Sequence, residues 1–226
     1  MTEYLYHGTT AKHLPQILCD GITTRREHRK TSNWKGTRAG SSHLDFVYLT
    51  DTYPFFFSMA NTKKSSAVVF EIEMKSMNGH LLYPDEDFIL EALKQQGRKD
   101  TTLEVSRQLL AYNRELWQVS LDKLGTVSYL GSIPAHALTR YVTVDFDVRK
   151  ILGMNILDPT ISVINKLVRG QFYQELLKWF FGDTPQLPQV KDFTDRAGDM
   201  EHIQKAIDFW TKESADRTGI TVTNLK

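Results

Sequence analysis

Along the first 146 residues, apolar positions form short runs separated by turn-forming residues, a pattern typical of β-strands. Between these runs, apolar residues recur at helical spacing. Strands are predicted at 4–6, 46–50, 67–74, 127–130 and 141–146, and helices at 11–20, 54–60, 87–96 and 101–118. In the third strand polar residues alternate with apolar ones, so Glu71 and Glu73 are expected to face solvent on a half-buried strand.

After about residue 150 the pattern becomes helical. Residues 161–181 are apolar at helical spacing, and a further amphipathic helix is marked by Met200, Ile203, Ile207 and Trp210. The chain has no internal repeats and no low-complexity segments. We therefore predict an α+β protein with a β-rich core over 1–150, followed by a helical extension over 151–226 that packs on the core.

Composition narrows the function classes. Hydrophobic residues make up 41% of the 226, and Lys+Arg 28 against Asp+Glu 27 leaves a net charge of +1. These values exclude wholesale disorder and a uniformly basic nucleic-acid coat. The single cysteine, Cys19, excludes an intramolecular disulfide, and the histidines lack metal-ligand spacing, so no metal site is expected. Neither a signal peptide nor a membrane span is evident, which predicts a soluble cytoplasmic protein.

A polar loop is predicted over 23–45, because this segment shows little periodicity. Positive charge is concentrated over residues 25–38, with one acid, Glu27, against Arg25, Arg26, Arg29, Lys30, Lys35 and Arg38. Arginines of this kind bind a pyrophosphate or a nucleic-acid backbone, and Trp34 offers a face on which a base can stack. A plain solvated basic loop is the alternative. Loops of this length are usually functional or mobile, so we expect a lid over a binding site.

Two motifs stand at predicted strand ends. His7-Gly8-Thr9-Thr10 closes the first strand, and Val47-Tyr48-Leu49-Thr50-Asp51 leads into a helix rich in phenylalanine. In both sequence and separation, these motifs resemble the ADP-ribosyltransferase superfamily in its His-Tyr-x branch. This branch includes poly-ADP-ribose polymerases, RNA 2′-phosphotransferases and bacterial DNA ADP-ribosyltransferase toxins. The resemblance covers roughly residues 4–146 and implies a split β core.

The resemblance also implies a ligand, NAD, which serves as the substrate. A glycine at a strand end allows close approach, so the Gly8 backbone is expected to clamp the nicotinamide carboxamide. His7 would contact a ribose hydroxyl, and Tyr48 would stack on the cationic pyridinium. The full set expected to bind NAD is His7, Gly8, Thr9, Arg38, Tyr48 and Phe57. A run of three phenylalanines on a helix points in several directions, so most of Phe55, Phe56 and Phe57 are expected in the core.

The third element of the family is a glutamate near the start of a late strand, where it stabilises the oxocarbenium-like transition state. In this chain Thr126 stands at that position. Asp122 or an acid of the Asp85-Glu86-Asp87 turn is a possible substitute, although acids in a first helical turn also serve as caps. The catalytic residues expected from the resemblance are His7, Tyr48 and Glu86, with His7 and Tyr48 lining one pocket.

The leading expectation is an enzyme that transfers ADP-ribose from NAD to a macromolecular acceptor and releases nicotinamide. The basic loop favours a nucleic acid over a protein as acceptor, through Arg25, Arg26, Arg29, Lys30 and Trp34. Two alternatives remain at this point: a phosphotransferase-like use of NAD, and a binding module that keeps the shape of the pocket without chemistry.

Overall fold

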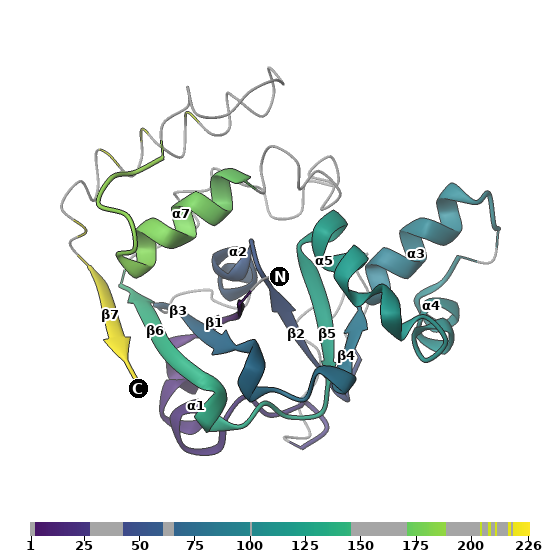
Figure 1. The fold of residues 1–226 in the computed structure, drawn as a ribbon, viewed down its shortest axis with the longest axis horizontal. Coiled ribbons are helices and arrows are strands. Elements are labelled where there is room, and N and C mark those ends of the chain that lie inside the picture. Colours follow the sequence, from purple (N-terminus) through teal and green to yellow (C-terminus); the bar gives the residue numbers. More distant parts are fainter. Residues whose placement is uncertain are drawn as a thin grey trace.

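A single antiparallel sheet organises the chain in the computed structural model (Figure 1). The structure describes residues 3–27, 43–60, 66–99, 101–145, 171–188 and 219–226, together with Gln204, Asp208, Thr211 and Arg217. The strands run in the order β4-β5-β2-β1-β3-β6-β7. Their bounds are β1 (Tyr4–Thr10), β2 (Phe46–Thr50), β3 (Ala67–Glu73), β4 (Leu82–Pro84), β5 (Thr126–Leu130), β6 (Leu138–Val144) and β7 (Ile220–Asn224).

Helices are interspersed between the strands, and the chain is therefore mixed α and β with an antiparallel sheet. They are α1 (Leu14–Asp20), α2 (Pro54–Ala60), α3 (Glu86–Gln95), α4 (Leu103–Leu110), α5 (Trp117–Leu124) and α7 (Gln171–Phe181). Short 3₁₀ turns are η1 (Ala11–His13), η2 (Met74–Ser76), η3 (Gly79–Leu81), η4 (Arg114–Leu116) and η5 (Ala135–Ala137). Figure 1 shows α3 and α4 beyond β4 at one end of the sheet, and α7 near β6 at the other.

The centre of the sheet is divided between β1 and β2. β1 pairs with β3 through seven register partners, from Tyr4↔Glu73 to Thr10↔Ala67. With β2 it shares a single register pair, Tyr6↔Thr50. The two strands part beyond that pair, so two half-sheets, β4-β5-β2 and β1-β3-β6-β7, meet at one narrow junction. We call the gap beyond this pair the β1/β2 split.

Helix α7 covers the β6 half of the sheet with an aromatic core. Trp179 and Phe180 are almost fully buried, and the Phe180 ring lies 4.0 Å from that of Phe55 between centroids. Phe55 is thus a core residue, as expected for the phenylalanine run. The chain beyond residue 150 is not helical throughout, however. It ends in β7, which joins the sheet beside β6 and makes this segment part of the sheet.

Glu71 does not face solvent, and that expectation is wrong. All seven residues of β3 are buried, because the strand lies between β1 and β6 and both of its faces are covered. The Glu71 carboxylate instead accepts hydrogen bonds from Arg140 Nε (2.8 Å) and Nη2 (2.7 Å), and from the Thr139 hydroxyl. Glu73 is also buried, and hydrogen bonds from Lys75, Ser76 and Lys226 lower its pKa to about 2.

Candidate functional site

The imidazole of His7 bridges the β1/β2 split. Its Nδ1 lies 3.1 Å from the carbonyl oxygen of Tyr48, 41 positions away in sequence. A carbonyl oxygen only accepts, so Nδ1 carries the proton and Nε2 is the accepting nitrogen of the neutral ring. Burial lowers the pKa of His7, against the opposing effect of this hydrogen bond, and favours the neutral form.

The structure brings His7 to the main chain of Tyr48, not to its phenol. Along β1, His7 alternates with Tyr6, whereas Tyr48 shares a face with Thr50, the register partner of Tyr6. The Tyr48 hydroxyl extends elsewhere, to accept a hydrogen bond from the His43 backbone N–H at 2.9 Å. The two side chains therefore lie on opposite faces of the sheet, and the expectation that they line one pocket is not met by this arrangement.

Gly8 lies inside a strand, which corrects the expectation that the first strand ends at His7. β1 continues to Thr10, and Thr9 is buried within it. A Cβ on Gly8 would stand 1.7 Å from the Pro54 carbonyl oxygen and 2.9 Å from the Ser58 nitrogen. Close packing of α2 on β1 is thus sufficient reason for glycine here.

Glu86, at the start of α3, lies next to Tyr48 on β2, although 38 positions of sequence separate the two residues. The carboxylate is 5% exposed and binds Arg107 with both oxygens, at 2.9 Å from Nε and 3.1 Å from Nη2. Burial raises the pKa of the Tyr48 phenol, and the negative charges of Glu86 and Asp85 raise it further. Tyr48 is therefore a neutral hydrogen-bonding group beside a fixed carboxylate.

A second acid reaches the start of β5, where the resemblance led us to expect a glutamate. Asp85 caps α3 by accepting from the Asp87 N–H at 2.9 Å, and its carboxylate is hydrogen-bonded to Thr126. Its own N–H donates to Ser120 Oγ, which donates to the Thr126 carbonyl. Burial is the main cause that raises the pKa of Asp85, to about 6. The expected capping role of this turn is observed, and Asp122 lies exposed on α5.

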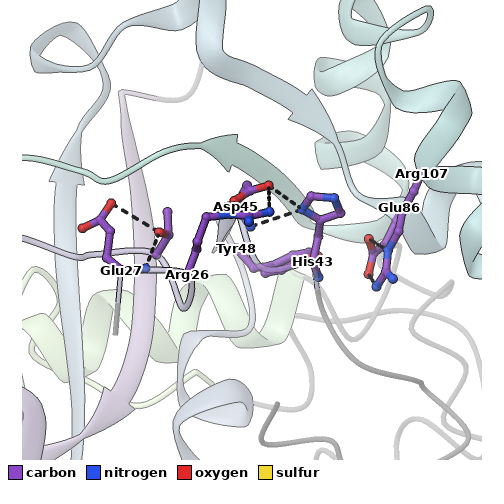
Figure 2. Close-up of polar contacts among 8 residues, drawn as sticks. Arg26, Glu27, His43, Asp45, Tyr48, Glu86 and Arg107 are labelled. Carbon is purple, nitrogen blue, oxygen red and sulfur yellow. Dashed lines mark hydrogen bonds and ion pairs between the residues drawn. The ribbon is translucent and has the colours of Figure 1, made fainter. Parts of the chain in front are cut away.

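His43 lies between two ion pairs, Arg26–Asp45 and Glu86–Arg107, as Figure 2 shows. Burial lowers the pKa of the His43 imidazole, and the Arg107 charge lowers it further. We call Arg25, His43, Tyr48, Glu86 and Arg107 the Tyr48–Glu86 cluster. Its charged members come from three separate segments, so no local pattern in the sequence marks Arg107 or His43.

The basic loop is described only at its ends. Arg26 is exposed, and its guanidinium forms a two-bond ion pair with Asp45, one bond being 2.8 Å from Nη2 to Oδ2. The tip of Arg25 is buried near Tyr48 and Glu86 instead of lying on the surface. The expected contacts and lid of residues 28–42 lie outside the described residues, among them Arg29, Lys30, Trp34, Lys35 and Arg38.

Phe57 is half-buried on α2, and its N–H donates to the Tyr53 carbonyl at 3.2 Å. Within the described ranges, no group of three or more His, Cys, Asp or Glu side chains is arranged to hold a metal ion. No helix in the same ranges has the length and apolar character needed to cross a membrane.

Comparison with known proteins shows a distant structural likeness. No protein-family model matches the chain, and no curated protein matches it. A solved structure named EcPltA is similar over 65% of this chain and 78% of that chain, with 15% sequence identity and a TM-score of 0.37. A likeness of this size assigns neither a family nor a function.

Proposed function

We propose that the chain binds NAD in the β1/β2 split and transfers its ADP-ribose to a macromolecular acceptor, releasing nicotinamide. The observation that best supports the proposal is the buried carboxylate of Glu86 beside Tyr48. The His7 ring reaches the main chain of Tyr48 at the split, and a ligand seated there would have to contact the two side chains from opposite faces of the sheet. With Thr126 at the start of β5, Glu86 takes the place of the missing acid.

In the proposed reaction the bond between C1′ of the ribose and the nicotinamide nitrogen breaks, and the nitrogen keeps the electron pair. An acceptor nucleophile forms the new bond to C1′ and loses its proton to solvent or to a nearby base. Positive charge develops on the ribose ring during this exchange, and a fixed carboxylate stabilises it. Glu86 is suited to this role, because Arg107 holds it rigidly with two hydrogen bonds.

His7 would position the ribose. With Nδ1–H donated to the Tyr48 carbonyl, Nε2 is left to accept from a ribose hydroxyl. Because burial keeps the ring neutral, this accepting nitrogen is available at neutral pH. We further propose a nucleic acid as acceptor, on the strength of the cationic residues of the basic loop in the sequence.

One observation favours a second candidate, a binding module without catalysis. The Glu86 carboxylate is already matched by the Arg107 guanidinium at two points, which reduces the field it exerts on a ligand. Under this alternative the pair is a structural bond between α3 and α4, and the split binds a nucleotide without cleaving it.

Nicotinamide release from labelled NAD separates the two, measured with DNA, RNA or protein present. We expect release by the wild type and a roughly hundredfold lower kcat for Glu86→Gln with a similar affinity for NAD. Asp122→Asn, at an exposed acid on α5, is the matched control and should leave kcat unchanged. Binding of NAD without release, under every acceptor, would favour the binding module.

A further inference from the structure

Arg25 ends in a buried position without a partner. Both terminal nitrogens of its guanidinium are buried, and neither has a hydrogen-bond partner in the structure as described. The main chain on either side is fixed: the Thr24 N–H donates to Ser132 Oγ at 3.2 Å, and the Arg26 N–H donates to the Leu44 carbonyl at 3.1 Å. The main chain around Arg25 is therefore held in place by its two neighbours.

One further cation and one carboxylate act on this guanidinium. Arg25 interacts electrostatically with Tyr48, Glu86 and Arg107. The one carboxylate among them, Glu86, already gives both of its oxygens to Arg107. Burial lowers the pKa of Arg25, but a guanidinium stays protonated, so its charge lies beside a carboxylate that is already bound by another arginine.

A buried charge without a partner is strongly unfavourable, and buried charges in proteins are normally paired. A second polar group nearby has the same property. Ser128 is the register partner of Tyr48, and its Oγ is buried with no hydrogen-bond partner among the described residues. Two unmatched polar groups beside one tyrosine indicate that a ligand supplies what the protein chain does not.

We propose that Arg25 binds a phosphate group of the ligand at the Tyr48–Glu86 cluster. A guanidinium presents parallel N–H donors that match two phosphate oxygens, and the negative charge of a phosphate would pair with the guanidinium charge. If the phosphate is one of the two in NAD, this inference rests on the proposed function. Free inorganic phosphate and pyrophosphate carry the same chemistry.

Calorimetric titration tests the proposal with inorganic phosphate, inorganic pyrophosphate and ADP-ribose as probes, on the full chain. Arg25→Met keeps the apolar stem and removes the charge. We expect it to weaken binding of ADP-ribose and pyrophosphate at least tenfold, and to raise the melting temperature of the ligand-free protein. Arg26→Met is the matched control, because Arg26 is exposed and paired with Asp45, and it should change neither quantity.

The melting temperature of the ligand-free protein separates two roles of Arg25. Arg25→Met should raise it if Arg25 serves to bind a ligand, and should lower it if Arg25 stabilises the fold. Equal affinity of wild type and Arg25→Met for every probe would overturn the proposal, as would binding of none of them by the wild type. Pyrophosphate that competes with ADP-ribose identifies a nucleotide ligand, and phosphate binding that ADP-ribose does not displace identifies a free anion.

The two proposals fail differently. Arg25-dependent binding of ADP-ribose without nicotinamide release would refute the transferase and leave the phosphate site standing. Nicotinamide release with the same NAD affinity in wild type and Arg25→Met would refute the phosphate site and leave the transferase standing.

Discussion

The ring of His7 replaces a missing backbone pairing: its Nδ1–H donates to the Tyr48 carbonyl where β1 and β2 have parted. The bond fixes both the tautomer of the ring and the width of the split at that point. His7 therefore contributes to the stability of the fold and is also a candidate ligand-binding residue.

Replacing His7 should change how stability depends on pH. Burial lowers the pKa of His7 in the folded protein, so between the folded value and the unfolded value near 6.5 the unfolded chain binds more protons. Stability therefore falls as pH decreases below about 6.5. We expect His7→Gln to lose less stability than wild type between pH 7 and pH 5 in urea unfolding. His80→Gln, at an exposed position, should follow the wild type, and parallel curves for His7→Gln and wild type would contradict this prediction.

Asp85 should give the free energy of unfolding the opposite dependence on pH, with stability falling as pH rises. Its pKa is raised to about 6, so the folded protein binds the extra proton between about pH 4 and pH 6. The stabilisation is complete below pH 4 and is lost as pH rises through 6, with an upper bound of about 3 kcal/mol. Asp85→Asn keeps the cap on α3 and cannot titrate. Its free energy of unfolding should be flatter across this range than that of wild type, and an unchanged slope would show that Asp85 is not protonated on folding.

Gly8 should tolerate no side chain, whatever the ligand. A Cβ at this position would lie 1.7 Å from the Pro54 carbonyl oxygen. Because this oxygen belongs to the main chain of α2, it cannot move aside as the end of a side chain could. We expect Gly8→Ala to lower the free energy of unfolding by about 3 kcal/mol. Gly79→Ala is the control, since nothing lies within 4 Å of the added Cβ. Equal melting temperatures for the two variants would show that α2 can withdraw from β1.

Ser128 and Ser120 are both buried, but their replacement by alanine is expected to change the free energy of unfolding in opposite directions. The Ser128 hydroxyl has no partner among the described residues, so Ser128→Ala should raise the free energy of unfolding by about 1 kcal/mol. The Ser120 hydroxyl accepts from Asp85 and donates to the Thr126 carbonyl, so Ser120→Ala should lower it by about 2 kcal/mol. Thermal or chemical unfolding of the two variants gives the comparison, and a loss of stability in Ser128→Ala would reveal a bond to that hydroxyl.

Local pattern alone was sufficient for most of the elements. The strand at Phe46–Thr50 is found where the sequence predicts it, and the helices at 87–96 and 54–60 differ from α3 and α2 by one residue at most. The helix predicted to end at residue 20 ends there, where Gly21 follows with a φ of 82° that favours glycine. These features depend on spacing and on residues within a few positions of each other, and the sequence contains that information directly.

What the sequence could not determine depends on partners far away in the chain. Glu71 alternates with apolar residues as a solvent-facing residue would, but its buried carboxylate pairs with Arg140 on β6, 69 positions later. The segment 101–118 is a single helix by pattern and becomes α4, η4 and the start of α5. Only the pairing of strands reveals that β7 completes the sheet.

For the candidate site the division is the same. The sequence by itself determined which residue types stand at His7, Tyr48 and Glu86, because their motifs are local. The tertiary structure alone decided that Glu86 meets Tyr48 and Arg107, and that Asp85 reaches Thr126. It also decided that the two terminal nitrogens of Arg25 are buried with no hydrogen-bond partner among the described residues. The physical reason is that hydrogen bonds, burial and charge balance depend on distances in space, and a sequence specifies those only through the fold.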